Sequence, residues 1–206
     1  MIIVDDGSDD SETLSVLQKI GNQYPEIQII RQKNGGLASA RNNGIKNSRG
    51  EFLMPLDADD TIEPEMLEKC YEEIVKNTKL GMVYTWVRFF GNDEAVWKSG
   101  EYNFYDFLCS NQATVSALVR KRAWEEVGGY DENMRDGYED WEFWINLGKA
   151  GWFGKLICEP LFNYRRHGTF ITSGAELKHD AIVKYIREKH GDLYSRKSLK
   201  GLSPIP

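Results

Sequence analysis

The sequence predicts an α/β protein with a mostly parallel open sheet and helices on both faces. Two observations support this class. Through the first 90 residues, short apolar runs of strand length alternate with segments whose apolar residues recur at helical spacing. The turns between them are short, and parallel neighbours in a sheet are joined by crossover helices. Such helices cover both faces of the sheet, which keeps its strands apolar.

The first half of the chain is expected to run in the order βαβαβαβ. Residues 2–4 form a strand that enters an acidic turn, and Ser8, Asp9 or Ser11 is suited to cap the next helix. That helix carries apolar residues at core spacing and ends near Gly21. The remaining elements are strands over 27–31, 51–56 and 82–90, with helices over 37–45 and from Pro64 onward.

The second half alternates less regularly. Residues 91–112 are polar and aromatic without a clear period, which predicts a loop with one short helix near 105–109. A helix over 138–149 is so rich in aromatic residues that it must be largely buried. The tail over 192–206 is polar and ends in prolines, as in a linker. The other elements are a strand over 114–119, a helix over 122–127, short strands over 156–158 and 162–165, and a helix over 177–191.

Composition excludes some classes of protein. The 206 residues carry a net charge of −6, which argues against nucleic-acid binding, because that needs a basic surface. No apolar run approaches the length of a membrane span. The cysteines Cys70, Cys109 and Cys158 are odd in number and widely spaced, so we expect reduced core thiols in a cytoplasmic protein.

The acidic run Asp57–Asp60 is the sharpest chemical signal in the chain. Three carboxylates directly after a buried strand repel one another and lose hydration, and a divalent cation would remove most of that penalty. Carboxylate oxygens are hard ligands that suit Mg²⁺ or Mn²⁺. The alternative is an Asp-rich turn that caps the helix from Pro64.

A second acidic pair, Asp5 and Asp6, also follows a predicted strand. In open parallel sheets, ligands bind beyond the carboxyl ends of the strands, so both acidic clusters should face the same crevice. Two acidic clusters at one edge suggest a phosphate ligand bridged by a metal ion. They do not by themselves name a reaction.

Two further groups could carry chemistry. Glu139 and Asp140 open an aromatic helix, where Asp140 could act as a general base. The alternative is stabilisation by the helix N-terminus, which also lowers a carboxylate's pKa and weakens it as a base. Arg166 and its neighbour beside His167 could clamp a diphosphate, with His167 as a metal ligand. The other histidines, His179 and His190, are expected to be solvated.

Five motifs occur in order along the chain: Val4–Asp10, Asn34–Asn42, Leu56–Asp60, Gly128–Glu132 and Glu139–Asp140. Together they resemble the family 2 glycosyltransferases, which have the nucleotide-diphospho-sugar transferase (GT-A) fold. The resemblance covers most of the chain to about His167. It implies a catalytic domain over 1–191, with a nucleotide-binding half over 1–90 and an acceptor half over 91–191.

The resemblance implies a role for each matching residue. Asp5 and Asp6 would hold the nucleotide base, and Arg41 would approach the nucleotide or brace that pair. Asp57 would face the ribose. The roles at the metal and the acceptor fall to Asp59 and His167 as ligands of Mn²⁺ or Mg²⁺, to Asp140 as the base that deprotonates the acceptor, and to Glu139, Asp60 and Arg166 as supporting residues.

The resemblance also implies a reaction. The enzyme would move a sugar from a nucleotide-diphospho-sugar, most simply a UDP-sugar, to a saccharide or lipid-linked acceptor. The acceptor hydroxyl would attack in line, so the anomeric configuration inverts, and the metal would neutralise charge on the leaving diphosphate. Such chemistry serves cell-surface polysaccharide or glycan synthesis, in the cytoplasm or peripherally at the inner face of the membrane.

The chain departs from this family at its start, because the strand and helix that precede the Val-Asp-Asp-Gly-Ser strand are absent from it. The missing strand is expected to expose a sheet edge, through which the chain could dimerise. A catalytically inactive nucleotide-binding or interaction module is therefore an alternative. A third alternative is a phosphoryl-accepting signalling domain, which also places acidic residues at strand ends but gives Glu139 and Asp140 no role.

Overall fold

The computed structural model describes residues 1–167, 177–195 and 198–199. In chain order its elements are β1 (Ile2–Asp5), α1 (Ser11–Gln23), β2 (Gln28–Arg31), α2 (Leu37–Asn47), β3 (Phe52–Leu53), β4 (Thr61–Ile62), α3 (Met66–Lys76), β5 (Leu80–Gly91), β6 (Ala95–Trp97), α4 (Phe104–Cys109), β7 (Leu118–Arg120), α5 (Lys121–Val127), α6 (Glu139–Lys149), β8 (Phe153–Arg166) and α8 (His179–Lys189). The expected α/β class is confirmed.

The strands of the described residues form two sheets. β1 and β2 pair in parallel by themselves, and the larger sheet has the order β3-β7-β5-β8-β4, with β6 added to β5. Within the described part of the larger sheet, β5 and β8 are parallel, whereas β3–β7, β5–β7, β4–β8 and β5–β6 are antiparallel. The sheet is therefore mixed, and the prediction of a mostly parallel sheet is wrong. The prediction failed because apolar patterning marks a strand without fixing its direction.

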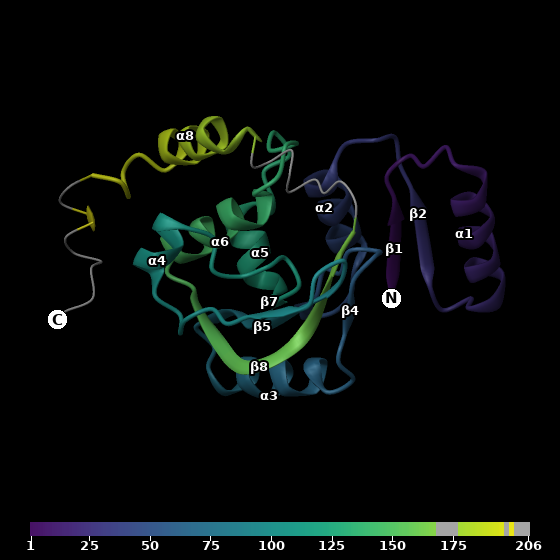
Figure 1. Cartoon of the computed structure of the whole chain (residues 1–206), viewed down its shortest axis with the longest axis horizontal. Helices are drawn as coiled ribbons and strands as arrows, with labels where there is room; N and C mark the ends of the chain where they lie inside the picture. Colours follow the sequence, from purple (N-terminus) through teal and green to yellow (C-terminus); the bar gives the residue numbers. More distant parts are fainter. Residues whose placement is uncertain (168–176, 196–197, 200–206) are drawn as a thin grey trace.

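Helices cover both faces of the larger sheet. Figure 1 shows α3 on one side of β5 and β8, with α5 and α6 on the other side. The unit of β1, α1 and β2 forms one end of the molecule, next to α2, and α8 lies at the opposite end, beyond α6 (Figure 1). No described helix is both long and apolar enough to cross a bilayer.

Several elements differ from the sequence expectation in their bounds. The cap of α1 is Asp10, whose carboxylate accepts a hydrogen bond from the Thr13 backbone N–H at 2.7 Å. β3 is only two residues long and ends before Pro55, which has no N–H to donate. The short strands β4 and β6 were not expected, and the two short strands expected after Gly151 form one bent strand, β8, with register shifts in its pairing.

The aromatic helix α6 is buried as expected and joins two of the three apolar clusters that the described residues form. Phe143 and Trp144 pack with β5, β7 and α5 in the largest cluster. Trp141 and Ile145 pack in a second cluster with residues of α4 and α8. Leu193 and Tyr194, in the segment expected to be a linker, also pack against this second cluster. The third cluster lies between α3 and the strands β5 and β8. The residues at the start of α6 therefore rest on a rigid support.

The cysteine expectation is correct only in part. All three cysteines are free thiols, but only Cys70 is buried, whereas Cys109 and Cys158 are exposed. Cys70 lies on the inner face of α3, and burial raises its pKa to about 12, which keeps the thiol protonated and inert. The exposed pair shows that spacing along the chain does not report burial.

Candidate active site

Arg41 is the centre of the acidic site. Its guanidinium donates to both carboxylate oxygens of Asp57, at 2.8 and 3.1 Å, and also to Glu139. The side chains of Arg41 and Glu139 are 9% and 6% exposed, so this bridge lies out of water. Burial alone would lower the pKa of Arg41, but the charges of Asp57 and Glu139 outweigh it and raise the pKa. The bridge joins α2, the acidic loop and α6.

The start of α2 explains why Arg41 lies where it does. Gly36 caps α2 with a φ of 89°, a left-handed conformation that favours glycine, and Arg41 follows little more than one turn later. The family resemblance implied a role for Arg41 near the nucleotide or the pair Asp5 and Asp6. Its ion-pair partners are instead Asp57 and Glu139, so it braces the acidic loop against α6.

Asp140 is the next residue on α6 after Glu139. Its carboxylate accepts a hydrogen bond from Asn111 at 3.2 Å and another from the Trp141 backbone N–H at 2.7 Å. Burial and the neighbouring charge of Glu139 raise the pKa of Asp140 to about 7, against the opposing charge of Arg41. The helix N-terminus opposes this rise through the bond from the Trp141 N–H, as expected, but burial and like charge dominate, so the net shift of the pKa is upward.

Asp59 and His167 meet at the far side of the acidic loop. His167 Nε2 lies 2.9 Å from an Asp59 carboxylate oxygen, and the two side chains are about half exposed, at 56% for His167 and 48% for Asp59. An imidazole nitrogen with a carboxylate oxygen suits Mn²⁺, which would complete its shell with phosphate oxygens and water. No group of three or more potential protein ligands occurs in the part of the chain that is described. The two side chains would supply one nitrogen and one oxygen ligand to such an ion.

Asp60 anchors the acidic loop to the sheet. It is 7% exposed and accepts a hydrogen bond from the Arg165 backbone N–H at 2.8 Å. Burial raises its pKa to about 7, the bond from Arg165 opposes the rise, and the charges of Asp59 and Asp57 add to it. A cation beside Asp59 would relieve this crowding of carboxylates.

Arg165, not Arg166, lies against the acidic loop. The Arg165 guanidinium donates to the backbone oxygen of Asp59 at 2.9 Å. Arg166 instead contacts Asp93 at 3.3 Å and covers the Phe89 ring at 4.0 Å. Arg165 and His167 both contact Asp59, and because residues two apart on an extended chain share a face, the sequence could have indicated Arg165 rather than Arg166.

Asp5 and Asp6 have different surroundings. Asp5 accepts a hydrogen bond from the Ser8 N–H at 2.8 Å and contacts Arg31 at 3.4 Å, and the bonds from Ser8 hold its pKa below the usual range. Asp6 accepts bonds from Gln32 and from the backbone N–H groups of Gly35 and Gly36. Asp6 therefore shapes the glycine turn that opens α2.

The loop before α6 is clamped to α2 on its other side. Asn42 donates to the Tyr130 carbonyl and accepts from the Tyr130 N–H, both at 2.9 Å, and also donates to Glu132. The buried Tyr130 ring lies 4.4 Å from Phe143 and 5.9 Å from the Arg41 guanidinium. Its hydroxyl has no hydrogen-bond partner among the described residues. The loop residue Tyr130 thus packs between the bridge and α6.

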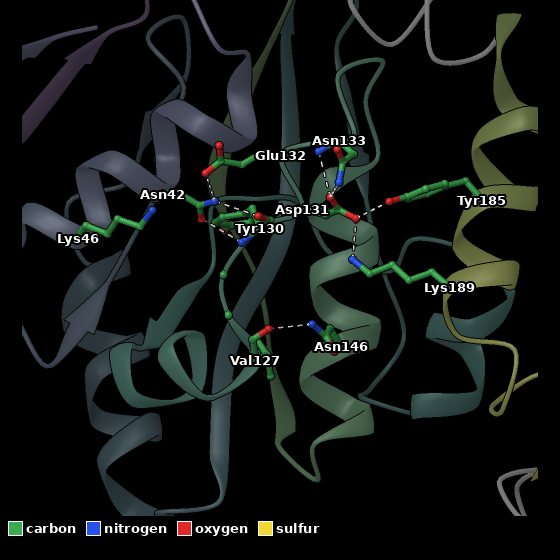
Figure 2. Close-up of a pocket in the computed structure, with 12 residues that line it drawn as sticks. Asn42, Lys46, Val127, Tyr130, Asp131, Glu132, Asn133, Asn146, Tyr185 and Lys189 are labelled. Atoms are coloured by element: carbon green, nitrogen blue, oxygen red, sulfur yellow. Dashed lines mark hydrogen bonds and ion pairs between the residues drawn. The ribbon is translucent and has the colours of Figure 1, made fainter.

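An open pocket of about 500 Å³ lies between α2, this loop, α6 and α8. Figure 2 shows Lys46 and Asn42 on one side of it and Tyr185 and Lys189 on the other. Asp131 joins the far side, because it accepts hydrogen bonds from both Tyr185 and Lys189 at 2.7 Å. Sequence reasoning found the motif Gly128–Glu132 but not these partners, which come from a distant helix.

Comparisons with known proteins identify the family of the chain. The model of the family described as "Glycosyl transferase family 2" matches residues 1–138. Among curated proteins, the chain is 32% identical over 175 residues to a chondroitin synthase of Pasteurella multocida, covering 81% of this chain and 17% of that protein. It has the same identity and coverage with a hyaluronan synthase of Pasteurella multocida. The chain thus spans about a sixth of these relatives.

Solved structures show the same fold. TarS of S. aureus (residues 1–349), in complex with UDP-GlcNAc, superposes with a TM-score of 0.69 at 18% identity, covering 84% of this chain and 51% of that one. At this identity the likeness concerns the fold alone. The family match rules out the alternative of a phosphoryl-accepting signalling domain. The chain belongs to glycosyl transferase family 2.

Proposed function

We propose that this chain transfers a sugar from a UDP-sugar to a hydroxyl of a saccharide or lipid-linked acceptor, with inversion, in the synthesis of a cell-surface glycan. The observation that carries the proposal is the bridge from Asp57 through the buried Arg41 to Glu139, which joins the acidic loop to the start of α6, where Asp140 follows Glu139. The family, the synthase names of the curated relatives and the UDP-GlcNAc bound to TarS support it.

The donor would lie over the acidic loop and the glycine turn. Asp6 and Asp5 would face the nucleotide base, and Asp57 the ribose. Arg41 would hold Asp57 in position, because its guanidinium already donates to both Asp57 oxygens. The fixed carboxylate then needs no rearrangement when the nucleotide binds, which keeps the entropic cost of binding low.

Asp140 would accept the proton of the acceptor hydroxyl. A pKa of about 7 suits a general base at neutral pH, because the group is partly deprotonated and still binds a proton readily. Asn111 would orient the carboxylate through its hydrogen bond. The acceptor oxygen would attack the anomeric carbon while the bond to the diphosphate breaks, and its proton would pass to Asp140.

Asp59 and His167 would hold a divalent metal ion. When bound, the metal would supply positive charge for the departing diphosphate. Arg165 would support the same loop by its bond to the Asp59 backbone oxygen. Asp60 would contribute indirectly, by anchoring the loop to β8.

Calorimetric titration of UDP into the chain, with and without Mn²⁺, tests the donor half of the proposal. We expect binding that needs the metal and is lost in Asp59→Ala. The matched control is Asp9→Ala, which removes an exposed carboxylate from the turn after β1. Metal-independent binding that survives Asp59→Ala would contradict the metal assignment.

Turnover tests the catalytic half. Release of UDP from a UDP-sugar, with and without a saccharide acceptor, should fall by about 10²-fold or more in Asp140→Asn. The exposed Asp106 offers the control, Asp106→Asn. Intact UDP binding without any release from a panel of UDP-sugars would favour the inactive nucleotide-binding module instead.

A further inference from the structure

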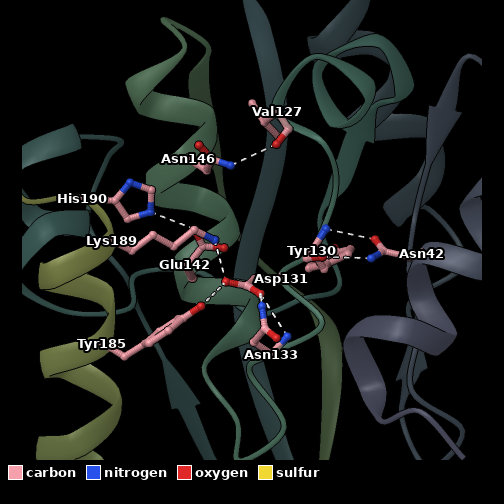
Figure 3. Close-up of polar contacts among 10 residues, drawn as sticks. All are labelled: Asn42, Val127, Tyr130, Asp131, Asn133, Glu142, Asn146, Tyr185, Lys189 and His190. Carbon is pink, nitrogen blue, oxygen red and sulfur yellow. Dashed lines mark hydrogen bonds and ion pairs between the residues drawn. The ribbon is translucent and has the colours of Figure 1, made fainter.

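Helix α8 contacts the segment around Asp140 at three points. At its start, His179 Nδ1 lies 3.3 Å from the hydroxyl of Tyr138, the residue that precedes α6. In its middle, Tyr185 donates to Asp131 at 2.7 Å. At its end, Lys189 and His190 both reach Glu142, at 2.9 and 2.7 Å (Figure 3). These contacts come from one helix that the chain reaches only after β8.

Glu142 is the deepest charge in this group. Its side chain is 0% exposed, and it lies two residues after Asp140 on the first turn of α6. A buried carboxylate is costly unless cations and hydrogen-bond donors surround it. Lys189 and His190 are those partners, and His190 is itself buried rather than solvated as the sequence suggested. The burial of Glu142 therefore depends on α8.

Lys189 joins two segments at once. Its ammonium contacts Asp131 at 2.7 Å in the loop before α6 and Glu142 at 2.9 Å inside α6. Burial alone would raise the pKa of Asp131, but the bond from Lys189, with those from Asn133 and Tyr185, lowers it to about 2. Asp131 is thus held charged. Lys189 therefore contacts the chain both before and after Glu139 and Asp140, at Asp131 and at Glu142.

Between Asp131 and Glu142, the backbone at Tyr138 has a conformation that its residue type does not favour. Tyr138 has a φ of 61°, an uncommon left-handed conformation for a bulky residue. Its ring contacts Trp141 and His179, with centroids 5.7 and 5.8 Å apart. Trp141 is fixed in turn, because its ring N–H donates to the Phe107 carbonyl. The surroundings of Tyr138 hold a conformation that the backbone alone would leave.

We propose that α8 is a strap that positions the start of α6, and that Lys189 is its central positioning residue. The inference rests on the proposed function, in which Asp140 is the base. Lys189 does not touch the reacting atoms. It acts through Asp131 and Glu142, and so fixes the distance of Asp140 from the groups that face it, which are Glu139, Arg41, Asn111 and the ring of Tyr130.

The test uses the full chain with Lys189→Met, Lys189→Arg and, as control, Lys184→Met. Lys184 is 75% exposed on the same helix, and within the described part of the chain its ion pair is with Glu188 alone. We expect Lys189→Met to lower kcat about tenfold or more while the donor KM changes less than about twofold, because a small misplacement of a catalytic group is costly. Lys189→Arg should restore most of kcat, and Lys184→Met should match the original chain.

A role in positioning predicts a change that mere loss of stability would not cause. In Lys189→Met the buried carboxylate of Glu142, two residues after Asp140, loses its cation, so the acid limb of the kcat profile should move to higher pH. A fall in activity that only tracks the unfolded fraction, with the limb and kcat of the folded enzyme unchanged, would overturn the proposal. An unchanged kcat and limb would overturn it as well.

Amide hydrogen exchange separates this inference from the proposed function. Amides of residues 138–143 should exchange about tenfold faster in Lys189→Met than in Lys184→Met, whether or not sugar is transferred. If the original chain turns over no donor, the proposed function fails, and the exchange result still decides whether α8 holds this segment. Equal exchange in the two variants would overturn the strap.

Discussion

The end of the molecule built from β1, α1 and β2 differs from the region around α6 in how its helix is buried. None of the 13 residues of α1 is buried, whereas seven of the 11 residues of α6 are. The first region holds Asp5 and Asp6, and the second holds Glu139 and Asp140. Asp5 and Asp6, proposed to face the nucleotide base, therefore lie beside a helix without buried residues, whereas the proposed base lies on a densely packed helix.

This contrast indicates where precision is needed. A nucleotide can draw a loose loop around itself, because binding energy offsets the ordering of a few side chains. A general base must be in place before the reaction, and a dense core provides that placement. Arg41 on α2 connects the acidic loop to the rigid region, since it holds Asp57 on one side and Glu139 on the other.

Arg41→Met should have the largest effect, because it removes the connection to the rigid region. It leaves the mostly buried Glu139 and the partly buried Asp57 without their cation, so we expect a loss of about 3 kcal/mol in the free energy of unfolding. Transfer should fall by about 10²-fold or more, since both carboxylates lose their positions. Urea unfolding and turnover measure the two effects. Arg49→Met, at an exposed position, is the control, and equal stability of the two variants would contradict the bridge.

The pH dependence of turnover tests the role of the rigid region. A base with a pKa of about 7 is protonated below that pH, so kcat should fall about tenfold per pH unit below 7. Burial is the main cause of the raised pKa and Glu139 the next, so Glu139→Gln should move the limb to lower pH. A limb near the ordinary pKa of an aspartate, about 4, in the original chain would show that another group is the base.

A pair of core truncations measures the packing of the two regions directly. Ile145→Ala empties a site that is 0% exposed and should cost about 3 kcal/mol. Leu17→Ala in α1 removes a half-buried side chain and should cost about 1 kcal/mol. Denaturant unfolding of both variants measures the two losses in the free energy of unfolding, which can then be compared. Equal costs would mean that α1 is held as firmly as α6.

Two glycines give the smallest effects, with opposite signs. Gly151 after α6 has a φ of 87° and open space where a Cβ would lie, so Gly151→Ala should cost about 1 kcal/mol through the backbone alone. Gly21 lies inside α1, where a Cβ would meet only the end of the Ile29 side chain at 3.3 Å. Gly21→Ala should stabilise by about 0.5 kcal/mol, because alanine favours a helix and the end of the Ile29 side chain can yield. Thermal unfolding checks both signs.

Much of the fold could be predicted because it is local. Helical spacing of apolar residues indicated α1, α2, α3 and α6, and Gly128 and Gly151 marked helix ends by their left-handed backbone. The direction of β7 and the single bent course of β8 could not be predicted. Both depend on pairing across the chain, as between Val119 and Met82, which no local pattern encodes.

The candidate site divides in the same way. Motifs identified Asp57, Asp59, Asp140 and His167 by residue type and order. They did not reveal that His190 is buried against Glu142, because a histidine near the end of an amphipathic helix looks solvated until its partner helix is known. The raised pKa of Asp140 was missed for a related reason, since burial by distant segments outweighs the local helix N-terminus.

The long parallel pairing of β5 with β8 has a consequence for how the protein is made. Leu80 pairs with Phe153 and Gly91 with Arg166, so β5 must wait for roughly 70 further residues before that edge is covered. Contacts so distant in sequence form slowly, and an apolar strand with a free edge invites wrong partners meanwhile. During synthesis the chain would therefore depend on chaperones or on low crowding until residue 166 is available. Its yield in a cell should respond to temperature more sharply than its final stability does.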